Sequence, residues 1–327
     1  MEEFPLVGII VTAYNNGKTI VQTLSTLSAQ TYPNKEIIVV CDNNSKDDTV
    51  LKVNDYIKNV KDARIVYCEG VGRSEARNIG WQNTSASIIM FADGDDLYEE
   101  EYISKAVRAL QASPDYGGVC LGGTALVTTN SLLNKFYKSY GSTDERMPAG
   151  REPDWAWVYR RECLVMVKGY DESLDQGEDK DLCSRVKALG FRIAYVEGIN
   201  WYHRKPETIR DLLKKEYFAG KRRVAYEIKV NKKNRYLFSS LAIVYGVMLL
   251  FTGYYAGATM SLLVIGLTIF LFFVYSSLRR KASTVTEVIG FTLLDFLMKI
   301  SYTVGQIDGT VTLSLRKTTI YTRGEES

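Results

Sequence analysis

The sequence predicts an α/β domain with a mostly parallel sheet, followed by a segment that associates with a membrane. Two observations support this prediction. Strand-like and helix-like stretches alternate through the first two thirds of the chain, which is typical of parallel sheets covered by helices on both faces. Beyond them, no charged residue occurs between Arg235 and Arg279, a stretch of 43 positions.

The alternation begins with the strand LVGIIVTAY, which starts at Leu6, and the helical pattern KTIVQTLSTLSAQ. A second strand, KEIIVVCD, precedes the helical VLKVNDYIKNV. A third, ARIVYCE, precedes a loop and helix in GRSEARNIGWQNT, and SIIMFA is the fourth strand. Ligands of such sheets collect at the carboxyl ends of the strands. The residues just after each strand are therefore the candidates for a binding site.

Charged and hydrogen-bonding residues stand at these strand ends. They are Thr12, Tyr14 and Asn15 after the first strand, Asp42 after the second, Arg73 and Arg77 after the third, and Asp93, Asp95 and Asp96 after the fourth. Carboxylates this close in sequence repel one another unless a cation neutralises them. Mg²⁺ and Mn²⁺ prefer oxygen ligands, and Mg²⁺ usually shares its shell with phosphates. The pattern predicts a divalent cation holding a diphosphate, although a solvated turn would explain FADGDD taken alone.

A second acidic cluster lies in DQGEDKDLCSRVKALGF, where Glu178, Asp179 and Asp181 precede or begin a helical pattern. Acids at a helix start complement the helix dipole, which accounts for Asp181. The helix dipole explains less well why Glu178 and Asp179 are adjacent just before Asp181.

Four segments together resemble glycosyltransferase family 2, whose members have the GT-A fold. They are VTAYNNGKTIVQTLSTLSAQTYPNKEIIVVCDNNSKDDT, SEARNIG, FADGDD and GYDESLDQGEDKDLCSRVKALG, in the family's order. The resemblance covers roughly Leu6 to Lys215. It implies transfer of a sugar from a nucleotide-diphosphate donor with inversion at the anomeric carbon, assisted by Mn²⁺ or Mg²⁺.

The resemblance also implies roles for individual residues. The nucleobase and ribose would be bound by Thr12, Tyr14, Asn15 and Asp42, and Arg77 would approach the diphosphate. Asp95 would bind the metal, Asp93 would lie nearer the ribose and could also join the metal, and Asp96 would lie behind the metal. Asp179, beside Glu178, would be the general base. Such a base is needed because the acceptor hydroxyl must lose its proton as it attacks. Thr12 departs from the family, which often has proline there.

Three further residues allow two readings each. His203, the only histidine, is either structural or close enough to reach the metal or diphosphate. Trp155 and Trp157, in DWAWVYRREC, either stack on an acceptor sugar or belong to the core.

The uncharged stretch predicts two membrane spans at about 237–251 and 258–278, with TGYYAG as the turn, because a span needs about 20 apolar residues. The alternative, one buried helix of a soluble core, would normally show a polar face. Basic residues flank both ends of the stretch, so the positive-inside rule places the catalytic domain and both termini in the cytoplasm of a multi-pass cell-membrane protein. The start, MEEFP, shows no signal-peptide pattern.

The segments around this hairpin also carry patterns. In 282–314, Glu287, Asp295 and Lys299 share one helical face, which favours an amphipathic helix in the membrane interface over a third span. A basic tail, 315–327, would follow. The basic segment 213–235 would attract anionic lipid. Within it, Lys214, Lys215 and Arg222 are candidates for binding a lipid-linked phosphate.

The predicted organisation is therefore a cytoplasmic catalytic domain at 1–212, joined to membrane lipids by the later segments. The leading function is transfer from GDP-mannose, or from UDP-N-acetylglucosamine, to a saccharide on a polyprenyl or dolichyl diphosphate, as in N-glycan or other lipid-linked glycan assembly. The alternatives are a dolichol-phosphate mannose (or glucose) synthase, and a non-catalytic nucleotide-sugar-binding scaffold. A net charge of +3 does not suggest a nucleic-acid partner.

Overall fold

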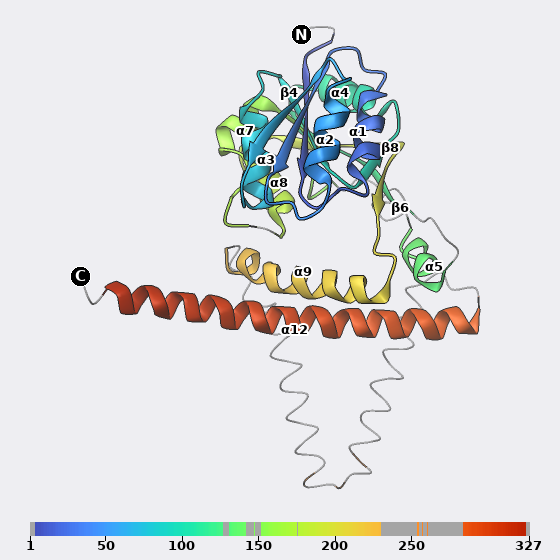
Figure 1. Cartoon of the computed structure of the whole chain (residues 1–327), viewed down its shortest axis with the longest axis vertical. Helices are drawn as coiled ribbons and strands as arrows, with labels where there is room; N and C mark the ends of the chain where they lie inside the picture. The colour runs from blue at the N-terminus through green and yellow to red at the C-terminus, as the bar shows by residue number, and fades with distance from the viewer. Residues whose placement is uncertain are drawn as a thin grey trace. The chain divides into compact units, whose positions relative to one another are not determined.

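The structure is a computed structural model, shown in Figure 1. It describes residues 4–126, 131–141, 152–174, 176–229 and 284–324, with the single positions 147, 254, 257 and 260. The chain divides into two compact units. The first contains Met1–Leu126 and Gly141–Arg204, and the second contains Val127–Tyr140 and Lys205–Ser327. Residues 127–140, which the sequence places inside the catalytic domain, thus group with the second unit.

The first unit is built on one sheet with the strand order β3-β2-β1-β4-β7-β6-β8-β5. Its strands are β1 (Val7–Ala13), β2 (Lys35–Asp42), β3 (Ala63–Cys68), β4 (Ile88–Asp93), β5 (Asp96–Tyr98), β6 (Tyr116–Leu126), β7 (Val158–Arg160) and β8 (Arg192–Arg204). The four strands β1 to β4 are parallel, as predicted. β7 is antiparallel to both of its neighbours, and β5 is antiparallel to β8, so the sheet is mixed.

Helices cover both faces of this sheet. They are α1 (Ile20–Ser28), α2 (Thr49–Ile57), α3 (Arg73–Gln82), α4 (Tyr102–Gln111), α7 (Arg161–Val167) and α8 (Glu178–Ala188). Apolar residues of α1, α2 and α4 pack in one core cluster, and those of α3, α7 and α8 pack in another. Within β1, Ile9 belongs to the first cluster and Ile10 to the second, because successive side chains of a strand point to opposite faces. The predicted α/β architecture is confirmed.

The register of the parallel strands brings the predicted site residues to one edge. Thr12 of β1 pairs with Asp93 of β4, and Ala13 pairs with Cys41 of β2, one residue before Asp42. The carboxyl ends of these three strands therefore lie together. All five cysteines are buried and none forms a disulfide.

The second unit contains three described helices, α5 (Leu132–Lys138), α9 (Ile209–Lys229) and α12 (Val285–Gly324), and Figure 1 shows α9 running alongside α12. α9 and α12 pack closely and run in the same direction, since Leu213 lies against Ser301 and Lys221 against Asp308. Gly220, Gly305 and Gly309 allow this approach. A Cβ at Gly305 would collide with the carbonyl of Tyr217, and one at Gly309 with that of Lys221.

One long face of α12 exposes apolar side chains. They are Val285, Ile289, Leu293, Phe296, Ile300, Val304, Ile307 and Val311, at intervals of three or four residues, and we call them the apolar stripe. Glu287 and Asp295 are instead buried in this unit, and Glu287 forms an ion pair with Lys135 of α5. Among the described helices, only Val285–Thr312 is long and apolar enough to cross a membrane. The predicted hairpin at 237–278 lies outside the described residues.

α12 begins close to the start of the amphipathic helix that the sequence predicts. It continues to Gly324, ten residues beyond the predicted end at 314, so that most of the predicted basic tail is helical. The interfacial position of this helix stays a prediction.

Candidate active site

The carboxylates of the acidic turn after β4, those of Asp93, Asp95 and Asp96, have different partners. Asp93 is the last residue of β4, Asp95 lies in the turn, and Asp96 begins β5. Gly94 makes the turn possible, because a Cβ there would lie 2.9 Å from the backbone oxygen of Thr12. The hydroxyl of Thr19 also donates to the Gly94 carbonyl at 2.8 Å. The turn is thereby held against the end of β1.

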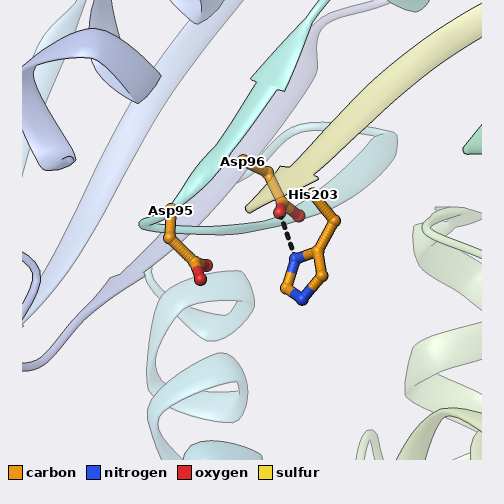
Figure 2. A group of neighbouring side chains, drawn as sticks. All are labelled: Asp95, Asp96 and His203. Atoms are coloured by element: carbon orange, nitrogen blue, oxygen red, sulfur yellow. Dashed lines mark hydrogen bonds and ion pairs between the residues drawn. The ribbon is translucent and has the colours of Figure 1, made fainter. Parts of the chain in front are cut away.

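Asp95, Asp96 and His203 form a cluster with the composition of a metal site (Figure 2). One ligand atom from each lies within 4.8 Å of the others. Asp96 and His203 are directly opposite each other in the β5–β8 pair, and the His203 Nδ1 lies 2.7 Å from the Asp96 carboxylate. Two carboxylates and an imidazole suit Mn²⁺ or Mg²⁺, so these residues fit a divalent cation. Asp96 stands in this cluster, whereas Asp93 as a metal ligand stays a prediction.

Arg77 connects the acidic turn to the second acidic cluster. It lies on α3 and its side chain is 1% exposed. One terminal nitrogen donates to Asp93 at 2.9 Å, and the other donates to Asp179 at 2.9 Å and to Glu178 at 3.2 Å. The structure thus brings together two acidic groups that are far apart in sequence. In the structure the Arg77 guanidinium is hydrogen-bonded to carboxylates. The predicted contact between Arg77 and a diphosphate stays a prediction.

The two acids held by Arg77 differ in their proton affinity. Burial is the main cause that raises the pKa of Asp179 to about 7. Arg77 opposes this rise, whereas the nearby Glu178 and Asp93 carboxylates contribute to it. For Asp93, burial also disfavours the charged form, but the Arg77 and Arg73 guanidiniums outweigh it and lower the pKa. A carboxylate whose pKa lies near neutral can accept a proton and release it again, which is what a general base requires.

At the other end of the strand edge, Asp42 organises a loop. Its carboxylate accepts backbone N–H groups from Asn44 at 2.8 Å and from Gly70 at 3.1 Å. Asn15 adopts a left-handed φ of 54°, and its side chain accepts the amide of Lys46 at 2.7 Å. Tyr14 is 51% exposed. Asp42 and Asn15 therefore order the loops at this strand edge, whereas Tyr14 is exposed to solvent. Nucleoside binding by these three residues stays a prediction.

Both predicted tryptophans are partly buried against the core cluster of α3, α7 and α8. Trp157 lies beside the guanidinium of Arg77, whose Cζ is 5.4 Å from the ring centroid, and Trp155 lies beside the ammonium of Lys180 at 5.8 Å. Each ring thus already contacts a cation. Stacking on an acceptor sugar stays a prediction for both.

Two aromatic residues of the site are missing from the sequence-based candidates. Tyr170 places its ring 5.2 Å from the Arg77 Cζ and donates its hydroxyl to Asp179 at 3.3 Å. Trp201 packs between Trp157 and His203, with ring centroids 5.6 and 5.8 Å away. Trp201 lies two residues before His203 on β8, so the strand period of two places both side chains on one face. That spacing could have identified it.

The candidate phosphate-binding cations belong to α9 in the second unit. Lys214, Lys215 and Arg222 are exposed, and the Arg222 guanidinium lies 5.7 Å from the ring centroid of Phe218. They share one side of α9 at helical spacing. Their role stays a prediction.

Comparison with known proteins agrees with this geometry. The family model described as glycosyl transferase family 2 matches residues 8–164. The probable glycosyltransferase YdaM of Bacillus subtilis is 25% identical over 224 residues, covering 64% of this chain and 53% of the relative. The UDP-Glc:α-D-GlcNAc-diphosphoundecaprenol β-1,3-glucosyltransferase WfaP of Escherichia coli is 38% identical over 111 residues, covering 32% of this chain and 41% of the relative. The chain thus spans about half the length of these curated relatives.

A solved structure shares the fold over most of the chain. It is the mannosyltransferase PcManGT of Pyrobaculum calidifontis, in complex with GDP-Man and Mn²⁺. The TM-score is 0.59 at 16% identity, with 93% of this chain and 87% of that chain covered. The residues matched by the family model, 8–164, contain the strand edge and the acidic turn described above. The chain therefore carries a glycosyltransferase family 2 domain with the GT-A fold.

Proposed function

We propose that this chain is an inverting, metal-dependent glycosyltransferase that acts at the cytoplasmic face of a membrane. It takes a sugar from a nucleotide-diphosphate donor and adds it to a saccharide carried on a polyprenyl or dolichyl diphosphate. The observation that carries this proposal is the Arg77 bridge, which joins the acidic turn on β4 to Asp179 on α8. A donor-binding acid and a candidate base at one strand edge are what a single-displacement sugar transfer requires.

Asp179 is the general base in this proposal. Its carboxylate takes the proton of the acceptor hydroxyl as the oxygen attacks the anomeric carbon, and the bond from that carbon to the diphosphate breaks. A single attack opposite the leaving group inverts the configuration. Because the pKa of Asp179 lies at about 7, the carboxylate is sufficiently deprotonated at neutral pH and remains basic enough to accept the proton.

Asp95 and His203 would hold the divalent cation, with Asp96 fixing the His203 ring through its contact to Nδ1. A bound Mn²⁺ or Mg²⁺ stabilises negative charge on a departing diphosphate. Asp93, held by Arg77, would accept a hydrogen bond from the donor ribose. Thr12, Tyr14, Asn15 and Asp42 would form the nucleoside pocket at the ends of β1 and β2.

GDP-mannose is our proposed donor, with UDP sugars as the competing class. PcManGT, which shares the fold, is in complex with GDP-Man and Mn²⁺. WfaP instead takes its name from UDP-Glc and from an acceptor on diphosphoundecaprenol. The similarity to WfaP supports a lipid-linked saccharide as the acceptor.

The apolar stripe of α12 supports a position at a membrane surface. Eight large apolar side chains exposed along one helix face match a helix that lies in the lipid interface. The exposed cations of α9 would bind anionic headgroups or the lipid-linked phosphate. Both termini would then remain on the cytoplasmic side.

The test offers radiolabelled GDP and UDP sugars, with Mn²⁺, to the full chain together with a synthetic polyprenyl-diphosphate saccharide. We expect label in the lipid product from one donor, and its loss with EDTA. Asp179→Asn should abolish transfer while nucleotide binding remains, and Glu162→Gln, an exposed acid on α7, should change neither. Label placed directly on a polyprenyl phosphate would support a lipid-phosphate synthase, and absence of transfer from every donor would contradict the proposal.

A further inference from the structure

We infer that Arg77 is a positioning residue that fixes the general base relative to the donor-binding acid, and that Arg73, one helical turn earlier, is the arginine that meets the diphosphate. This inference rests on the proposed function for the identity of the base. It differs from the role that family resemblance suggests for Arg77.

The first argument is burial. Only 1% of the Arg77 side chain is exposed, whereas 46% of the Arg73 side chain is exposed. A diphosphate could reach Arg77 only by displacing carboxylates that already occupy both of its terminal nitrogens. Among the described residues, the ion pair of Arg73 is a longer contact of 3.6 Å to Glu178, and Arg73 also interacts electrostatically with Asp93. It can therefore turn toward a ligand without leaving several buried charges unpaired.

The second argument is the number of directions in which Arg77 is held. One terminal nitrogen donates a hydrogen bond to Asp93 at the end of β4, and the other donates to Asp179 at the start of α8. The rings of Trp157 and Tyr170 lie 5.4 and 5.2 Å from its Cζ. A planar guanidinium suits both two-sided hydrogen bonding and contact with aromatic rings, whereas an ammonium offers one point charge. The geometry is that of a rigid connector between Asp93 and Asp179.

The third argument concerns the consequence for Asp179. The charged groups that face it are Arg77 and Arg73 from α3, Asp93 from β4 and Glu178 from α8. The neutral hydroxyl of Tyr170, from the segment after α7, donates a hydrogen bond to it. Arg77 is the nearest cation, at 2.9 Å, and it also fixes the direction of the carboxylate. Without it, the base would be displaced and would face Glu178 and Asp93 with less compensation.

The experiment compares Arg77→Lys with Arg73→Gln. Binding of UDP and of GDP with Mn²⁺ is measured by calorimetry, which does not depend on turnover. Arg77→Lys should keep nucleotide affinity within about fivefold of wild type, whereas Arg73→Gln should weaken it by roughly tenfold or more, the usual size for a charged hydrogen bond. In transfer assays, Arg77→Lys should lower kcat by about 100-fold, because a small misplacement of a catalytic group costs that much.

Tyr170→Phe provides a second variant in case Arg77→Lys fails to fold. It keeps the ring beside Arg77 but removes the hydroxyl that donates to Asp179. The acidic limb of its pH–rate profile should move to higher pH while nucleotide affinity stays unchanged. Equal weakening of nucleotide binding by Arg77→Lys and Arg73→Gln would overturn the inference, as would an unchanged kcat in Arg77→Lys. Failure of the proposed function would appear differently, as wild-type protein that binds nucleotide without any transfer.

Discussion

Asp179→Asn should make the catalytic domain more stable than the wild type, and the difference in stability should be larger at pH 8 than at pH 5. Burial raises the pKa of this carboxyl from 3.8 to about 7 in the folded protein. The shift of roughly three units corresponds to about 4 kcal/mol of free energy. Between these two pKa values the folded state holds a proton that the unfolded state has lost. The stability contributed by this group is therefore present below about pH 4 and is lost as pH rises through 7.

Thermal unfolding of the full chain between pH 5 and 8, in EDTA, would measure this effect. For a domain of this size each kcal/mol moves the Tm by about 2–4 °C, so the wild-type Tm should fall by up to about 10 °C from this group alone. Asn resembles the protonated acid, so the variant should lack this fall. Glu162→Gln serves as the exposed control. Parallel curves for wild type and Asp179→Asn would refute the reasoning, because they would mean that Asp179 ionises at its ordinary pKa when folded.

Three further outcomes are expected. Asp95→Asn should weaken nucleotide binding in Mn²⁺ but not in EDTA, as measured by calorimetry; equal weakening in both would exclude a metal role. Gly305→Leu should lower the unfolding free energy of the helix pair by about 1–3 kcal/mol through overpacking, because its side chain would meet the Tyr217 carbonyl; an unchanged Tm in detergent would contradict this close packing. Leu293→Lys and Phe296→Lys should reduce flotation with anionic liposomes, and unaltered flotation would argue against membrane contact by the apolar stripe.

Much of the fold could be predicted because its signals are local. The apolar runs of β1, β2 and β4 are buried on both faces, and runs of this kind identify strands of a parallel sheet without knowledge of distant contacts. The convergence of Thr12 and Asp93 then follows from parallel pairing. The grouping of residues 127–140 with the second unit could not be foreseen, because it depends on the non-local packing of α5 against α12.

The site was predictable in its chemistry but not in its pairing. Sequence reasoning identified Asp93, Asp95 and Asp179 as separate acids. It could not show that Arg77 binds two of them, since that requires the fold to bring the Arg77 side chain of α3 within hydrogen-bonding distance of both the end of β4 and the start of α8. Tyr170 joins the same network from GYDESLDQGEDKDLCSRVKALG, one of the segments that carry the family resemblance, but nothing in that pattern assigns Tyr170 a role. Only the folded backbone brings its hydroxyl to Asp179.

The burial of every cysteine has a practical consequence for spectroscopy. Burial raises the pKa of Cys41 and Cys68 to about 11 and that of Cys163 and Cys183 to about 12, so these thiols hold little reactive thiolate at neutral pH. A cysteine introduced on the exposed face of α12, such as Leu293→Cys, would react much faster than the native ones. An environment-sensitive fluorophore could then be attached at that position in the otherwise unaltered protein. Its emission would report whether the helix face meets water or lipid.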